Sequence, residues 1–180
     1  MAYYGAEAAV EAMDEFLQAA TYGLNAQLGT MRSDLSLTTA ELPDVSQFEK
    51  YYPKGMQARQ FPHLCIVYLS DTAEQEPNSR MINLAIETQL TVLDLNVSGT
   101  EAEVGLAMCR YRDALTKIYL RRTPVGKQGW TLSNGGTVAT GRVIRCTIET
   151  HTLAFDPEIQ ASTPNMMLRT TYLVRMQEDY

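Results

Sequence analysis

The sequence predicts an α+β fold, in which a twisted, mainly antiparallel sheet of four or more strands carries two helices packed on one face. Apolar residues recur at every second position over 82–92, which predicts a half-buried strand, and at helical spacing over 104–119. Two long stretches near the C-terminus, 138–155 and 166–176, also alternate and predict a pair of strands. The expected order is therefore helix, strand, strand, helix, strand, strand.

Size and charge indicate one globular domain spanning residues 1–180, with 45% hydrophobic and 20% charged residues. The net charge of −6 argues against a general nucleic-acid binder, which needs a basic surplus. Residues 1–100 carry a charge of −8 and residues 101–180 a charge of +2. Such a division predicts an acidic and a basic surface suited to head-to-tail self-association, unless the charges are distributed by chance.

The three cysteines, Cys65, Cys109 and Cys146, lie in apolar patterns at no metal-like spacing, which predicts buried thiols in a reducing compartment. The first fifteen residues carry four acids where a signal peptide would be apolar, and no run reaches the length of a membrane span. The chain is therefore expected to be made and folded in a cytoplasm.

A first helix is expected over 6–28, with acids in its first turns and Gly29 at its end. No periodicity holds over 30–60, where prolines and a glycine interrupt the chain. This predicts a long irregular loop or arm, which either folds over its own core or reaches a neighbouring subunit.

Residues 61–69 are apolar on both faces, which predicts a central strand covered on both sides. The acidic stretch over 71–79 is expected to be an exposed turn that completes an antiparallel hairpin with the strand beginning at Ile82. At Val92–Leu93 the apolar phase slips by one residue, which predicts a β-bulge or bend.

The second helix is expected to begin at Thr100 and Glu103, which have capping-box spacing, and to end before Pro124. Turns are expected over 123–136, a stretch that contains Trp130 and an Asn-Gly-Gly hairpin signal.

Three pairs of residues could carry chemistry, and none has a complete pattern. His63 and Cys65 point the same way from one strand, but they stand about 7 Å apart, too far for direct activation of a nucleophile. A buried, hydrogen-bonded histidine is the alternative. His151 and Glu149 lack a third metal ligand, and the Gly-Lys pair at 126–127 lacks the rest of a phosphate loop. The sequence thus predicts no catalytic residue, no metal site and no cofactor, and so no enzyme.

A docking surface fits the pattern better, because the polar face of the two C-terminal strands carries mixed charges in register. Its residues are Arg145, Thr147, Glu149, Arg169, Thr171 and Arg175, joined as candidates by Arg110 and Arg112 of the second helix and by Glu74 and Glu76 of the acidic turn. Charge reversal at Arg169 or Arg175 is expected to impair assembly and leave monomer folding intact. The alternative is a solvated face whose ion pairs stabilise little.

The segment 103–115, EVGLAMCRYRDAL, resembles the central helix of tail terminator (tail completion) proteins of long-tailed bacteriophages. In that family a pattern alanine-x-x-arginine-hydrophobic-arginine-aspartate-alanine-leucine follows a strand. The matching residues here are Ala107, Arg110, Arg112, Asp113, Ala114 and Leu115. The acidic first helix, the polar-faced strand before the motif and the two long C-terminal strands also fit, whereas the connection over 30–60 is longer than expected of the family.

The resemblance implies a structural virion protein of the tail-neck region without catalytic activity. Such proteins form a ring, usually hexameric, that caps the tail tube, stops its polymerisation and offers a surface to neck and head-completion proteins. DNA passes through the ring lumen without sequence-specific binding. Another neck or head-completion connector remains an alternative, as does a small cytoplasmic enzyme or ligand-binding domain that uses His63, Cys65 or the Trp130 loop.

Overall fold

The computed structural model describes residues 5–51, 59–76, 78–93, 97, 101–122, 141–154 and 165–179. The elements are α1 (Gly5–Gln18), α2 (Leu24–Leu35), β1 (Gln47–Lys50), β2 (His63–Glu76), β3 (Ser79–Leu93), α3 (Glu101–Arg122), β4 (Gly141–Ala154) and β5 (Asn165–Asp179). The predicted turns over 123–136, including Trp130, lie outside the described residues.

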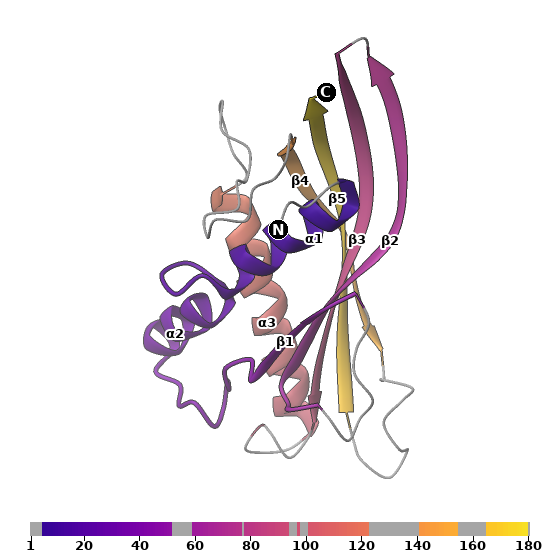
Figure 1. Cartoon of the computed structure of the whole chain (residues 1–180). Helices are drawn as coiled ribbons and strands as arrows, with labels where there is room; N and C mark the ends of the chain where they lie inside the picture. Colours follow the sequence, from indigo (N-terminus) through magenta and orange to yellow (C-terminus); the bar gives the residue numbers. More distant parts are fainter. Residues whose placement is uncertain are drawn as a thin grey trace.

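The strands form one five-stranded sheet in the order β1-β2-β3-β5-β4. β1 pairs with β2 in parallel, and the other three pairings are antiparallel. Helices α1 and α3 lie along one face of the sheet, and α2 lies beside α3 (Figure 1). The α+β class is confirmed, but the element order is α-α-β-β-β-α-β-β rather than the predicted one, with a third helix and a short fifth strand.

The core fills the space between the helices and one face of the sheet. Along β3 the side chains of Leu84, Ile86 and Leu90 are fully buried, and they stand opposite Val174, Tyr172 and Leu168 of β5. Burial of each such apolar side chain contributes about 1.5–3 kcal/mol, so the period of two recognised in the sequence marks the side that faces the helices.

The predicted helix over 6–28 is wrong, because the chain breaks between α1 and α2. Gly23 precedes α2 with an extended backbone, and its amide donates to the carbonyl of Ala19 at 2.7 Å. A Cβ at this position would stand 2.4 Å from the carbonyl oxygen of Leu17, so glycine is the residue that fits this close turn.

The segment over 30–60 is not irregular throughout. Helix α2 continues past Gly29 to Leu35 and ends at Ser36, whose left-handed backbone (φ 55°) allows the Leu37 amide to reach the carbonyl of Arg32 at 2.9 Å. Leu42 and Val45 then pack into the core, and β1 follows. In its described part this segment therefore folds over its own domain.

The hairpin of β2 and β3 is longer than the sequence suggested. Residues 71–76, expected as an acidic turn, continue β2, because they pair with residues 79–84 of β3. The apolar run at the start of β2 is covered on both sides as far as Ile66, whereas Tyr68 and Leu69 are exposed.

The predicted slip at Val92–Leu93 does not interrupt β3, which keeps an unbroken register with β5 to Leu93. The register shifts instead in β2, between Tyr68 and Ser70, and twice in β4.

Tyr111 of α3 ties the segment after α2 to the core, because its hydroxyl donates to the Pro43 carbonyl at 2.6 Å and burial raises the pKa of this phenol. Tyr111→Phe leaves that carbonyl without its donor, so we expect the free energy of unfolding to fall by about 1–3 kcal/mol. Urea denaturation measures this change. Tyr68→Phe, on an exposed side chain, should change it by less than about 0.5 kcal/mol, and equal effects of both substitutions would contradict the assignment.

Candidate docking surface

The face of the sheet turned away from the helices, here called the open face, carries the side chains that alternate with the core residues. Outside one covered end, its described residues are Val67, Ser70, Thr72 and Glu74 of β2, Met81, Asn83, Ala85, Glu87 and Gln89 of β3, Arg169, Thr171, Leu173, Arg175 and Gln177 of β5, and Arg145, Thr147, Thr150 and Thr152 of β4. Most of these side chains are polar, as is common on an antiparallel sheet whose second face meets water or a partner.

Two arginines stand directly opposite each other on this face. Arg145 of β4 is the register partner of Arg175 of β5, and both are exposed. Like charges placed opposite each other on neighbouring strands destabilise a sheet. Neither arginine forms an ion pair with any residue in the described part of the chain. Within the described ranges, this arginine pair is therefore a cationic spot that no ion-paired carboxylate compensates.

A third arginine, Arg169, lies further along β5, and its positive charge is next to a carboxylate. Its Nε lies 3.9 Å from Glu87 Oε1, close enough for Coulomb attraction but too far for a hydrogen bond. The same carboxylate oxygen accepts a hydrogen bond from Gln89 at 2.8 Å. Thr171 occupies the next row, opposite Glu87 and Thr150.

The structure brings five of the ten predicted residues together on two adjacent strands: Arg145, Thr147, Arg169, Thr171 and Arg175. Glu74 lies on the same face, on β2.

The remaining predicted residues lie elsewhere. Glu149 falls at a register shift in β4 between Ile148 and Thr150, and is exposed there. Arg110 and Arg112 belong to α3, on the helical side of the sheet, where Arg112 donates two hydrogen bonds to Asp113 at 2.6 and 3.0 Å. Glu76 ends β2, and its side chain lies outside the described part.

The candidate list missed Leu173, which is 46% exposed in the row beside the arginine pair. The alternation along β5 could have identified it, because Leu173 lies on the same side of the strand as Thr171 and Arg175.

The other end of the open face is covered by residues 59–62. Here His63, 1% exposed, has its Nε2 3.1 Å from Glu49 Oε2, and the second oxygen of Glu49 accepts a hydrogen bond from Gln47 at 2.7 Å. The amide of Gln60 donates in turn to Gln47 at 2.6 Å. The network fixes this segment to β1 and β2, and it confirms the interpretation of His63 as a buried histidine with a partner.

Cys65 shares this buried end of the face with His63. Burial, together with the negative charge of Glu49, raises the pKa of the Cys65 thiol to about 12. A thiolate is the nucleophilic form of cysteine, so these surroundings disfavour the Cys–His interpretation.

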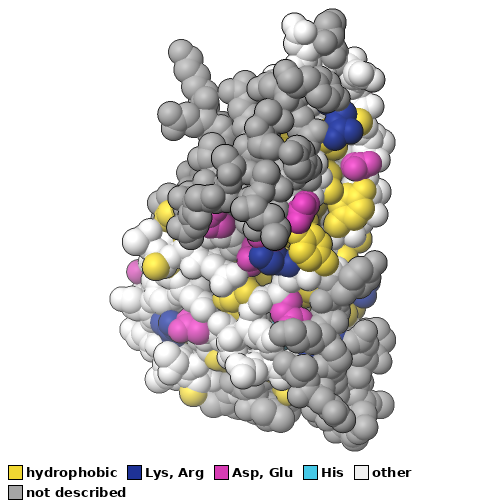
Figure 2. All heavy atoms as spheres, in the orientation of Figure 1, with side chains coloured by type: hydrophobic (Ala, Val, Ile, Leu, Met, Phe, Trp, Pro, Cys, Tyr) yellow, Lys and Arg dark blue, Asp and Glu magenta, His cyan; other side chains and the backbone are white. Residues whose placement is uncertain are grey.

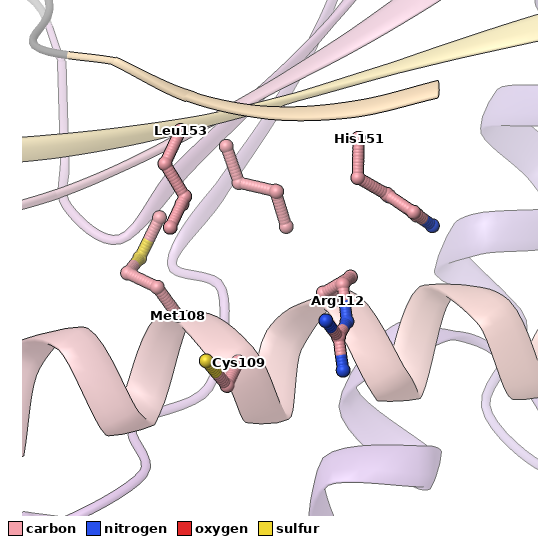
Figure 3. A pocket seen from close by; sticks show the side chains of 6 residues that line it. Met108, Cys109, Arg112, His151 and Leu153 are labelled. Atoms are coloured by element: carbon pink, nitrogen blue, oxygen red, sulfur yellow. The ribbon is translucent and has the colours of Figure 1, made fainter. Parts of the chain in front are cut away.

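A pocket of about 210 Å³ lies between α3 and the C-terminal strands, lined by Met108, Cys109, Arg112, His151, Leu153 and Leu168. Figure 3 shows Leu153 and Met108 pointing toward each other, with His151 directed from β4 toward the helix. The two nitrogens of His151 lie 3.0 Å from Thr170 Oγ1 and 3.3 Å from Thr116 Oγ1. The volume is below the range typical of ligand sites, and the polar groups at its rim already have partners.

Among the described residues, no group of three or more His, Cys, Asp or Glu side chains is arranged to hold a metal ion. Nor does any helix within those ranges have the length and hydropathy needed to cross a membrane.

Comparisons with known proteins give little further information. No family model matches the chain, and no curated protein matches it. Among solved structures, a chain from the "Virion of native gene transfer agent (GTA) particle" is similar, with 12% sequence identity and a TM-score of 0.37 over 96% of this chain and 93% of that chain.

Only one of the three cysteines is accessible, which corrects the expectation of three buried thiols. Cys109 is exposed, whereas Cys65 and Cys146 are buried and burial raises the pKa of both thiols. At pH 8 a thiol of pKa about 12 is ionised in about one molecule in ten thousand. We expect an aromatic disulfide reagent to modify one thiol rapidly in the native protein and three in denaturant. Rapid modification of Cys109→Ser would contradict this arrangement.

Burial lowers the pKa of His151, and the positive charge of Arg112 adds to this effect against the opposing charge of Asp113. The unfolded chain therefore binds the proton more readily, and the stability contributed by neutral His151 is present above about pH 6.5 and lost as the pH falls below that value. His151→Gln should remove this part of the pH dependence. Urea unfolding at pH 7.5 and 5.5 measures it, and subtracting the variant's curve isolates the part that His151 contributes. An equal loss of stability in both proteins would contradict the prediction.

Proposed function

We propose that this chain is a structural subunit of a phage-like virion, and that it forms a ring, of six copies, on the end of a tail tube. The ring ends polymerisation of the tube and presents a docking surface to neck and head-completion proteins, while DNA passes through its lumen without being read. The proposal combines the motif resemblance of α3 with the properties of the open face.

The observation that carries the proposal is the arginine pair. A sheet face with two adjacent, uncompensated arginines costs the monomer stability, and a partner that supplies carboxylates removes that cost. Exposed leucines on the same molecule, Leu173 among them, add apolar area to such a contact. Among the described residues, His63 and Cys65 are buried, and both ring nitrogens of His151 lie within hydrogen-bonding distance of threonine hydroxyls.

The family-like motif of α3 is consistent with a structural role. Ala107, Ala114 and Leu115 are fully buried against the sheet and the other helices, and the small alanines permit close approach of the helix. The motif thus maintains the layer that positions the open face, and it contributes no reactive group.

A different neck or head-completion connector would use the same surfaces, because it also needs self-association and docking. The position in the particle separates the two candidates, since a terminator contacts tube subunits and a connector does not.

The purified chain is expected to form a closed ring with a mass several times that of the 20.1 kDa monomer. Size-exclusion chromatography with light scattering measures the mass, and negative-stain electron microscopy shows whether the ring closes. Labelled subunits should be found at the junction of tail tube and head in purified particles. A chain that is absent from particles would rule out the proposal, and one located in the head-proximal connector would favour the alternative.

A further inference from the structure

The hairpin of β2 and β3 extends past the helices (Figure 1). In the described part of the chain β1 pairs with β2 only as far as Ile66, so the following stretch of β2 is an edge of the sheet. Residues 68–75 are exposed at every position, on both faces of the strand. Eight strand residues span about 25 Å, so the hairpin can reach a neighbouring molecule.

This edge carries both carboxylates and apolar side chains. Glu74 lies on the open face of β2, whereas Asp71 and Tyr68, opposite Leu84 and Ile86, lie on its helix side. All are exposed along this edge, Tyr68 by 38%, and Leu69 beside the bulge is 48% exposed. Figure 2 shows hydrophobic side chains at the surface along this side of the molecule, with acidic side chains beside them. An exposed apolar patch rimmed by charged side chains is typical of a protein interaction site rather than of a solvated edge.

The arginine pair and Leu173 form the complementary surface, with two positive charges beside an exposed leucine. Among the described residues, no ion pair joins the two surfaces within one molecule. Glu74 lies in the row of Met81 and Gln177, two strands across and two residues along from Arg175, so about 12 Å separates their Cα atoms. A second molecule can bring carboxylates closer to the arginine pair.

We propose that the β2 edge of one copy docks on the open face of a second copy, with Asp71 and Glu74 against Arg145 and Arg175 and with Tyr68 and Leu69 covering Leu173. This inference rests on the self-association in the proposed function and identifies its two surfaces. The two surfaces differ, so the contact is heterologous and repeats from copy to copy, which produces a ring where the rotation closes.

The bulges favour docking through side chains over addition of a strand. β2 is irregular between Tyr68 and Ser70, and β4, at the opposite edge, is irregular near Arg145 and again near Thr150. Bulges at sheet edges interrupt the regular row of backbone groups that continuous strand pairing needs.

Charge exchange between the two surfaces tests the contact. One variant carries Arg145→Glu and Arg175→Glu, and the other carries Asp71→Lys and Glu74→Lys. Each alone should self-associate at least about tenfold more weakly than the wild type, because like charges then meet. An equimolar mixture of the two should recover assembly, as should a single chain with all four changes. Analytical ultracentrifugation at low and high salt measures the association, and circular dichroism checks folding.

The single variant Arg175→Glu has a matched control in Lys117→Glu on α3, because each substitution reverses one positive charge. Arg175→Glu should weaken association, and Lys117→Glu should leave it unchanged. Wild-type association of either double variant, or failure of the mixture and the four-change chain to recover assembly, would overturn this contact while a ring built on other surfaces survives. A wild-type chain that stays monomeric at all concentrations would overturn the proposed function as well. If the arginine variant instead loses binding to a labelled DNA duplex and keeps its assembly, the arginine pair is a phosphate site and the contact is overturned.

Discussion

The packing of the β3–β5 pair against α3 is the interaction on which the rest of the structure depends. Ile86 and Tyr172 stand opposite each other at the centre of the core, where the Tyr172 hydroxyl also lies 3.2 Å from Thr88 Oγ1. Because side chains alternate along a strand, this packing also determines which side chains lie on the open face. A shift of one residue in β5 would bury Arg175 and expose Val174, so core burial and the arginine pair are consequences of one register.

Much of this architecture could be predicted from periodicity. The half-buried β3, the amphipathic α3 and the antiparallel hairpin follow from local patterns that match their burial in the structure. The break before Gly23 could not be predicted, because the apolar stripe continues through it in sequence, and the close approach of backbone carbonyls that requires glycine exists only in the folded chain. Similarly, α2 continues through Gly29 because packing of its Leu28 and Met31 into the core outweighs the weak helix propensity of glycine.

The docking surface was partly predictable for the same reason. Alternation places Arg169, Thr171 and Arg175 on one face of β5. That Arg145 stands directly opposite Arg175 depends on a register shift in β4, and bulges of this kind leave no clear mark in a single sequence. The pairing of His63 with Glu49 could not be predicted either, since Glu49 lies on a short parallel strand inside a segment without periodicity. Pairings between distant strands are properties of the assembled sheet.

The alternation along β5 also separates two kinds of evolutionary constraint within one strand. Val174 and Tyr172 are held by the core, and almost any change there costs stability. Arg175 and Leu173, their immediate neighbours, face away from the core and are free to change with whatever they contact. A lineage could therefore acquire a new binding partner by a few substitutions at odd-numbered positions, while the scaffold beneath them stays the same.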